Sequence, residues 1–416
     1  MRVDENGNWR SFRHRNFRIL YPANALSNIG TWAQRVAQDW LVLELTNNNG
    51  FYLGLVTAIQ FAPVLFFSLH GGALADRVDK RKLLIFTNVV AALACYLLGA
   101  LVVLEVVQLW HVFFCAAVLG ISSALDAPIR QSFTAEIVGH SDVANAVSLN
   151  SANFNAGRLV GPALSGFLIA RFDTGPSFLI NATTYLFVIA SLFLMRPADF
   201  FIQKKEETLG TVREGLRYAL ARPDLYVVMA LVFFAATFGL NFQIFNALMA
   251  TKEFGKGPAS YGLLGTYIAI GSLTGALLSA RLERFRTAML VVRLGVWFSL
   301  VVIALAFMPT YWIYSLWLPI CGVSALTMLI SANSYVQVNS DPAVRGRVMG
   351  IYLLIFMGGT PFGSLLIGYL TEAVGVRQTI VLCGLISLVT STLIWIFYRD
   401  KVQTPKDLRV STVLGK

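Results

Sequence analysis

Twelve apolar segments run through this sequence of 416 residues, each long enough to cross a lipid bilayer as an α-helix. A bilayer-spanning helix needs ~20 mostly apolar residues, and only helices and closed barrels satisfy their backbone hydrogen bonds inside lipid. Charged residues make up 13% of the chain, whereas soluble domains carry about 25%. We therefore expect an all-α membrane protein with twelve transmembrane helices, at residues 17–45, 51–74, 83–104, 109–129, 145–170, 177–195, 225–249, 260–280, 288–308, 311–330, 348–370 and 378–398.

The Lys and Arg residues gather on alternate connections between these segments. When the N-terminus is placed in the cytoplasm, 27 of the 33 fall on the cytoplasmic side, which is the side that short basic loops prefer. Topology and contact with anionic membrane lipid then account for the net charge of +11, and no nucleic-acid partner is needed. We expect both termini in the cytoplasm. Because Arg35 and Asp39 interrupt the first apolar segment, we expect no removable signal peptide.

The two halves of the chain carry similar phrases. DVANAVSL begins at Asp142 in the first half, and DPAVRGRVMG begins 199 residues later, at Asp341. Pro162 and Pro361, which follow the two phrases, are also 199 residues apart. Paired halves around a midplane site are a recurrent design of membrane transporters. We expect two pseudo-symmetric six-helix bundles at 1–195 and 224–398, joined by a central cytoplasmic linker at 196–223 and followed by a cytoplasmic tail at 399–416.

The stretch GGALADRVDKRKLL, residues 71–84, concentrates charge between the second and third apolar segments, and we expect a sharp turn to begin at Gly71 and Gly72. Its order of residues resembles the signature loop of the major facilitator superfamily, with Asp79 where that pattern has glycine. If this loop has no functional role, its charges form a solvated ion pair, which contributes about 0–1 kcal/mol to stability. The resemblance implies a conformational latch that bridges the two halves in the outward-facing state, formed by Gly72, Asp76, Arg77 and Arg81.

The phrase AGRLVGPALSGFL, residues 156–168, places small residues every four positions on the fifth segment. Gly157, Gly161 and Ser165 make a strip that another helix can approach closely, and Pro162 removes one backbone hydrogen bond. The phrase resembles the fifth-helix motif of the superfamily's drug and proton antiporters; the alternative is ordinary helix packing. Phrases such as SNIGTWAQRVAQDWLVLELT and RGRVMGIY resemble the bacterial enterobactin-exporter-like and macrolide-efflux-like subfamily. This resemblance implies a proton-coupled exporter of a bacterial plasma (inner) membrane.

Polar residues recur every three or four positions on the first and fifth segments, and this spacing places them on one face of each helix. Polar groups at membrane depth face a water-filled cavity or one another. The first stripe is Asn24, Asn28, Thr31, Arg35 and Asp39, and the second is Ser148, Ser151, Asn155 and Arg158. We therefore predict a substrate cavity lined by Asn28, Thr31 and Asn155 and, from the second half, by Asn241, Gln243, Asn246 and Ser331.

Arg35, Asp39 and Arg158 are predicted to form a charged cluster, because a buried arginine costs about 2.5–3.5 kcal/mol on insertion scales and needs a partner. The cluster is either a static link between the first and fifth helices or a proton-coupling site. In the second case Asp39 carries the proton, since its protonation releases an arginine. Two arginines to one aspartate favour anionic or neutral substrates over lipophilic cations. Asp126 and Arg130, four residues apart on the fourth segment, are predicted to form a gate or a fold contact.

The sequence contains no P-loop, nucleotide-binding fingerprint, metal-ligand cluster or nucleophile–base constellation. We therefore expect no cofactor, no metal and no enzyme activity, with energy supplied by an ion gradient. The leading hypothesis is a monomeric exporter that works by proton antiport and alternating access on an amphipathic small molecule, siderophore-like or drug-like. A facilitator or importer of the same fold and a non-transporting membrane sensor or partner are the alternatives.

Overall fold

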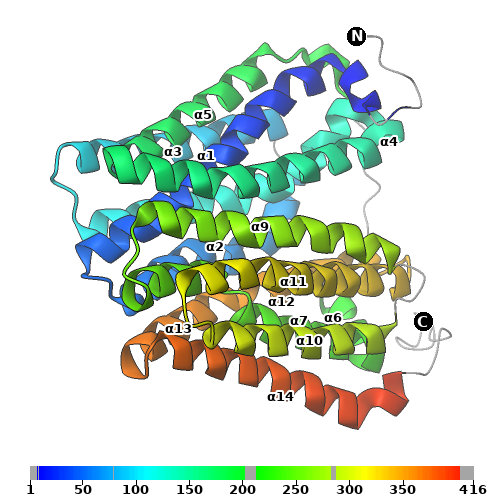
Figure 1. The fold of residues 1–416 in the computed structure, drawn as a ribbon. Coiled ribbons are helices and arrows are strands. Elements are labelled where there is room, and N and C mark those ends of the chain that lie inside the picture. Colours follow the sequence, from blue (N-terminus) through cyan, green and yellow to red (C-terminus); the bar gives the residue numbers. More distant parts are fainter. Residues whose placement is uncertain (1–6, 8, 78, 202–211, 283–286, 403–416) are drawn as a thin grey trace. The chain divides into compact units, whose positions relative to one another are not determined.

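The computed structural model describes residue 7 and residues 9–77, 79–201, 212–282 and 287–402 (Figure 1). Residues 202–211 of the predicted linker and 403–416 of the predicted tail lie outside the described residues. Within the described part of the chain, every regular element is a helix.

Ten helical segments of the described residues are long and apolar enough to cross a membrane. One of them, the 64-residue α4 (Leu109–Phe172), contains two spans, because Gly139 adopts a φ of 69° and breaks the helix between them. The 31-residue α1 (Arg15–Leu45) adds the first span, whose polar stripe lowers its hydropathy. The prediction of an all-α membrane protein with twelve transmembrane helices is therefore confirmed.

Contacts divide the chain into two compact units, and each unit includes a short segment from the other half of the sequence. The helices α2 (Gly50–Arg77) and α9 (Pro258–Arg281) each begin in one unit and continue in the other. Unit 1 contains Met1–Asn47, Ala62–Glu206 and Lys256–Thr266, and unit 2 contains Asn48–Phe61, Glu207–Gly255 and Tyr267–Lys416. The bundle boundaries that we expect from the sequence stay a prediction.

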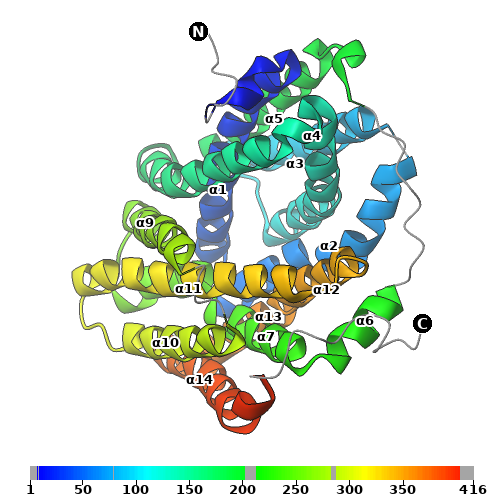
Figure 2. The ribbon, with the colours of Figure 1, turned by 90° about the vertical axis from the view of Figure 1, so that its right-hand side faces the viewer.

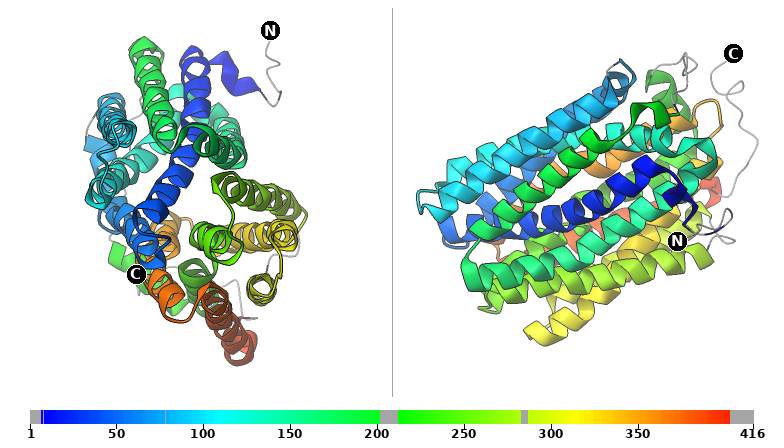
Figure 3. Two further views of the ribbon diagram at one scale, coloured as in Figure 1. Left: turned by 60° about the vertical axis from the view of Figure 1, so that its left-hand side comes forward. Right: turned by 90° about the horizontal axis from the view of Figure 1, so that it is seen from above.

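Unit 1 is built on α1, α3 (Lys80–Val103), α4 and α5 (Gly175–Leu194), with α1 and α3 each packed against both α4 and α5 (Figures 2 and 3). Two glycines of the second α4 span let α1 approach closely. A Cβ built at Gly157 would lie 2.9 Å from the Cβ of Asn28, and one at Gly161 would lie 2.6 Å from the Cβ of Trp32. The small-residue strip is thus a contact surface for the helix that carries the polar stripe.

Adding one methyl group to this contact is expected to destabilise the protein. In Gly161→Ala the new Cβ meets Trp32 and the backbone oxygen of Ile29 at 2.8 Å, and overpacking of this kind costs about 1–3 kcal/mol. Gly350→Ala is the matched control, since nothing lies within 4 Å of a Cβ there and alanine favours a helix. The thermal unfolding midpoint in detergent should fall in the first variant only. Equal midpoints would mean that the α1–α4 contact relaxes around the methyl group.

The outward faces of the unit 1 helices carry large apolar side chains. On α3, Phe86 and Leu93 are 60% and 63% exposed, and on α5 Phe193 is 63% exposed. Phe86 and Leu93 are seven residues apart, which places them on one helix face. Large exposed apolar faces are rare on soluble monomers, and these faces suit contact with lipid.

The basic loop between the second and third spans differs from its prediction. The helix α2 continues through Gly71 and Gly72 to Arg77, so the predicted turn at these glycines is wrong. The residues that follow them, Ala-Leu-Ala, have high helix propensity and extend the helix. Asp79 lies at the start of α3, where its carboxylate accepts a hydrogen bond from the backbone N–H of Lys82 at 3.2 Å. An N-cap aspartate stabilises a helix start, which explains why this chain can replace the glycine of the superfamily pattern.

The N-terminal segment docks where the second α4 span begins. Asp142, with a side chain 2% exposed, lies 2.8 Å from Nε of Arg13 and 2.7 Å from Nε2 of His14. The Ser11 hydroxyl donates to Oδ1 of Asn145 at 2.6 Å. A buried carboxylate needs partners of this kind, and these contacts hold the start of α1 against α4.

In unit 2, α10 (Ala288–Ala306) packs against α11 (Tyr311–Asn339) and α14 (Val376–Val402). The seventh span is interrupted by two π-helical turns and comprises α7 (Pro223–Phe234), η3 (Ala235–Gly239), α8 (Phe242–Leu248) and η4 (Met249–Glu253). The eleventh is divided into α12 (Arg345–Gly358) and α13 (Thr360–Ala373). A Cβ at Gly359, between them, would overlap Thr237 of η3, so the two interruptions lie against each other.

Candidate functional site

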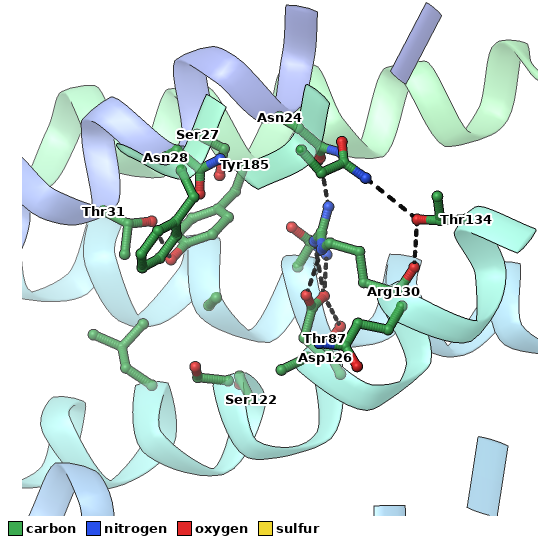
Figure 4. Close-up of a pocket in the computed structure, with 18 of the residues that line it drawn as sticks. Asn24, Ser27, Asn28, Thr31, Thr87, Ser122, Asp126, Arg130, Thr134 and Tyr185 are labelled. Carbon is green, nitrogen blue, oxygen red and sulfur yellow. Dashed lines mark hydrogen bonds and ion pairs between the residues drawn. The ribbon is translucent and has the colours of Figure 1, made fainter. Parts of the chain in front are cut away.

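A cavity of about 540 Å³ lies inside unit 1 (Figure 4). The polar face of α1 forms one wall, and the other walls come from α3, α4 and α5. Its volume is in the range of about 300–1,000 Å³ that small-molecule sites occupy. Of the residues in the predicted stripes and site, the structure brings seven to this one cavity: Asn24, Asn28, Thr31, Arg35, Ser151, Asp126 and Arg130.

Asp126 and Arg130 form a doubly hydrogen-bonded ion pair in the cavity wall (Figure 4). Arg130 donates from Nε to Oδ2 at 2.7 Å and from Nη2 to Oδ1 at 2.9 Å. Thr87 and Asn88 of α3 also donate to Oδ1 of Asp126, at 3.1 and 3.0 Å. Arg130 Nη1 donates to Oδ1 of Asn24 on α1. Bidentate pairs have fixed geometry, so this pair ties α1, α3 and α4 together.

Arg35 reaches the cavity eleven residues after Asn24, about 16 Å further along α1 at 1.5 Å per residue. Its Cζ lies 5.0 Å from the centroid of the Trp32 ring, and the Cζ of Arg158 lies 5.8 Å from the same ring. Phe154, which also lines the cavity, packs edge-on against Trp32 with 5.6 Å between ring centroids. The structure thus brings Arg35 and Arg158 together at one aromatic ring, within the distance at which cation–π attraction acts.

Asp39 lies one helical turn beyond Arg35 and is 2% exposed. Its Oδ2 accepts a hydrogen bond from the hydroxyl of Tyr261 at 2.7 Å, and its charge interacts with that of Arg35. Tyr261 also stacks on Trp40, with 6.3 Å between ring centroids. Asp39 therefore connects an arginine of the cavity to the segment Lys256–Thr266, which contributes the start of α9 to unit 1.

The same segment contacts Pro162 of the antiporter-type motif. A Cβ at Gly265 would lie 2.8 Å from the Cβ of Pro162. The Thr266 hydroxyl donates to the backbone oxygen of Leu159 at 3.0 Å. The motif thus contacts α1 through its glycines and the start of α9 through its proline.

Of the other residues predicted for the cavity, Asn155 and Asn241 bond to the backbone of their own helical span, and Asn246 bonds to α11. Asn155 donates to the backbone oxygen of Ser151 at 2.8 Å and does not line the cavity described above. In unit 2, Asn241 donates to the backbone oxygen of Thr237 at 2.8 Å, and Asn246 accepts from Tyr314 at 2.8 Å. Gln243 is half-buried, whereas Ser331 is fully buried and its hydroxyl has no hydrogen-bond partner among the described residues. Their substrate contacts stay a prediction.

Of the predicted latch residues, the structure describes the side chain of Arg81 alone. It donates to the backbone oxygens of Leu192 at 2.7 Å and Phe193 at 3.1 Å, and so satisfies carbonyl groups at the end of α5. Gly72, Asp76 and Arg77 lie in the last turns of α2, and their side chains are outside the described part.

Among the site residues that sequence reasoning missed, four lie against residues that it did predict. Thr87 and Asn88, which bind Asp126, form a polar pair inside an apolar segment, and that pair was an available signal. Tyr185 lines the cavity with its hydroxyl 3.5 Å from that of Thr31, and Tyr261 binds Asp39. No sequence signal identified the tyrosines, because tyrosine is common in membrane helices.

Twelve membrane spans among the described residues, with a polar and charged cavity of small-molecule size in unit 1, define a multi-pass membrane transport protein. Residues 6–413 match the transmembrane secretion effector family, and the chain belongs to this family of the major facilitator superfamily. The family resemblance seen in the sequence motifs is confirmed. The protein is a transporter of this fold and not an enzyme.

Curated relatives cover most of the chain. The staphyloferrin A transporter of Staphylococcus aureus (strain NCTC 8325 / PS 47) is 25% identical over 93% of this chain and 97% of its own length. The multidrug efflux pump Tap of Mycolicibacterium fortuitum is 26% identical over 87% and 90%. The enterobactin exporter EntS of Escherichia coli O81 (strain ED1a) is 23% identical over 85% of each chain.

Solved structures share the fold. A bacterial homologue of the human lysosomal transporter Spinster, in an inward-facing and unoccupied conformation, has a TM-score of 0.75 at 14% identity and covers 94% of this chain and 98% of its own. A D-xylose–proton symporter has a TM-score of 0.68 at 15% identity and covers 92% and 98%. At these identities the likeness concerns the fold alone.

Proposed function

We propose that the protein exports an amphipathic small molecule, siderophore-like or drug-like, by proton antiport with alternating access. The observation that carries the proposal is the polar cavity in unit 1, which combines the stripe of α1 with the Asp126–Arg130 pair. Relatives named as a staphyloferrin A transporter, an enterobactin exporter and a multidrug efflux pump support this kind of substrate, and the last two names support this direction.

Asp39 is the proposed proton carrier, with Arg35 and Arg158 as the arginines of the coupling site. A carboxylate that is 2% exposed is costly to keep charged unless it has partners. The hydroxyl of Tyr261 and the charge of Arg35 are such partners. Protonation weakens both interactions, because the neutral acid is a poorer hydrogen-bond acceptor and carries no charge. A proton would thus loosen the contact between α1 and the segment Lys256–Thr266.

The remaining parts of the proposal concern the conformational cycle. The bundles 1–195 and 224–398 would alternate in access, with both termini in the cytoplasm of a bacterial inner membrane and the protein acting as a monomer. Gly72, Asp76, Arg77 and Arg81 would form the latch, and Asp126 with Arg130 the gate. In the cavity, substrate would contact Asn28 and Thr31. As the cycle proceeds, it would contact Asn155, Asn241, Gln243, Asn246 and Ser331.

Transport by the purified protein in proteoliposomes tests the function. Staphyloferrin A, enterobactin and an uncharged macrolide are supplied in turn, and an internal pH-sensitive dye reports proton movement. Antiport predicts substrate movement against an imposed pH gradient, with protons moving in the opposite direction. Equilibration without a gradient would identify a facilitator, and movement with the protons would identify an importer. Failure to move any of the three would favour a non-transporting membrane protein.

A further inference from the structure

Two guanidinium groups share the Trp32 ring beside the cavity. The Cζ atoms of Arg35 and Arg158 lie 5.0 and 5.8 Å from the ring centroid, so they can be no further apart than the sum of these distances. The two positive charges repel each other. Two like charges held in a mostly apolar surrounding are stabilised when an anion lies between them.

The positive charge of Arg158 is less compensated by nearby negative charge than that of Arg35. It is half-buried in the second α4 span, and among the described residues it makes no ion pair with a carboxylate. Its cation–π contact with Trp32 offsets part of the cost of desolvation, but leaves the donors of the guanidinium plane available. A guanidinium group binds a planar oxyanion through two parallel hydrogen bonds.

The surroundings of the pair suit one kind of ligand. Arg35 and Phe154 line the cavity, and Thr31 lies one turn before Arg35 on the same wall. The rings of Phe154 and Trp32 offer an apolar surface directly beside the two charges. The negative charge of Asp126, by contrast, is already held by two hydrogen bonds from Arg130.

We infer that Arg158, Arg35 and Trp32 form a subsite for the oxyanion of an amphipathic substrate, with the substrate's apolar part against Phe154. The inference rests on the proposed function for its substrate, but binding can be measured without transport. The oxyanion is a carboxylate or a phosphate, and it supplies the counter-ion of Arg158. The subsite selects anions over their neutral analogues and rejects lipophilic cations.

Isothermal titration with a matched pair of probes tests the subsite. The probes are 1-naphthaleneacetate and 1-naphthaleneacetamide, which have similar shape and differ in charge, and the full-length protein is held in detergent. Hydrogen bonds to charged groups are strong, and we expect the carboxylate to bind at least about tenfold more tightly than the amide. Arg158→Gln should abolish this preference, and Arg158→Lys should retain part of it because the charge stays while the planar fork is lost.

Arg171→Gln is the matched control, because Arg171 lies at the exposed end of the same helix, 6.0 Å from the Phe172 ring. This variant should keep the wild-type preference. Equal affinity of the wild type for the two probes, or a preference that survives in Arg158→Gln, would overturn the inference. Titrations of the carboxylate probe with added phosphatidylglycerol, compared with phosphatidylcholine, distinguish a free substrate from a lipid headgroup. If phosphatidylglycerol alone competes with the probe, a lipid phosphate is an occupant of the same oxyanion site.

The inference and the proposed function fail separately. Asp39→Asn removes the negative charge near Arg35, so this variant should bind the carboxylate probe at least as tightly as the wild type, although its proton-coupled efflux is lost. Anion preference without proton-driven transport in the wild type would keep the subsite and reject antiport. Antiport without anion preference would keep the proposed function and reject the subsite.

Discussion

Asp39→Asn is expected to reduce proton-driven efflux to the level of protein-free liposomes while the protein still inserts and folds. Asparagine keeps the size of the side chain and can accept the hydrogen bond from Tyr261, which spans 2.7 Å in the wild type. It cannot bind or release a proton, so the coupling step is lost. The measurement is substrate efflux against an imposed pH gradient in proteoliposomes, together with gel-filtration and thermal-unfolding profiles of the variant.

Two further variants separate the proton from the hydrogen bond. Tyr261→Phe removes the donor and leaves the carboxylate titratable, so efflux should be slowed but still coupled. Asp173→Asn is the matched control: Asp173 is exposed and has a φ of 71°, a conformation that asparagine tolerates well. Its efflux should equal that of the wild type. Undiminished coupled efflux in Asp39→Asn would move the proton site elsewhere, with Asp126 the next candidate.

The helices of this fold could be predicted from local sequence, because membrane length and hydropathy are properties of each segment alone. The ends of helices could not be predicted as well. Gly71 and Gly72 suggested a turn, yet α2 continues to Arg77, since neighbouring residues with high helix propensity outweigh two permissive glycines. The break at Gly139 is the opposite case: a positive φ at this glycine divides the long helix α4 into two membrane spans.

The polar wall that α1 gives to the cavity could be predicted from the sequence of α1 alone. The residues of other helices that bind the charged groups of the site could not. The period of α1 places Asn28, Thr31 and Arg35 on one face, and all three line the cavity. The partners of Asp126 and Asp39 come from α3 and from the start of α9. Such pairings depend on how distant segments pack, which no local periodicity records.

The ion pair of Asp126 and Arg130 is expected to carry the second large effect. Asp126→Asn leaves Arg130 without its charged partner, and hydrogen bonds to charged groups contribute about 1.5–3 kcal/mol each. Because these two side chains also bind Asn24, Thr87 and Asn88, the loss extends to three helices. We expect each single variant, Asp126→Asn and Arg130→Gln, to lower the thermal midpoint clearly. We also expect efflux to fall by about tenfold, because a free-energy change of about 1.4 kcal/mol corresponds to a factor of ten in an equilibrium constant.

The double variant distinguishes a gate from a fold contact. Asp126→Asn with Arg130→Gln leaves no unpaired charge, so its loss of stability should be smaller than that of the two single variants added together, with a coupling energy of about 1–3 kcal/mol. The exposed pair Asp79 and Lys82, 3.9 Å apart, is the matched control and should show about 0–1 kcal/mol. Additive effects at Asp126 and Arg130 would show that the pair does not act as a unit. If the double variant recovers stability but not efflux, the charges are needed during the conformational cycle; if it recovers both, the pair serves the fold alone.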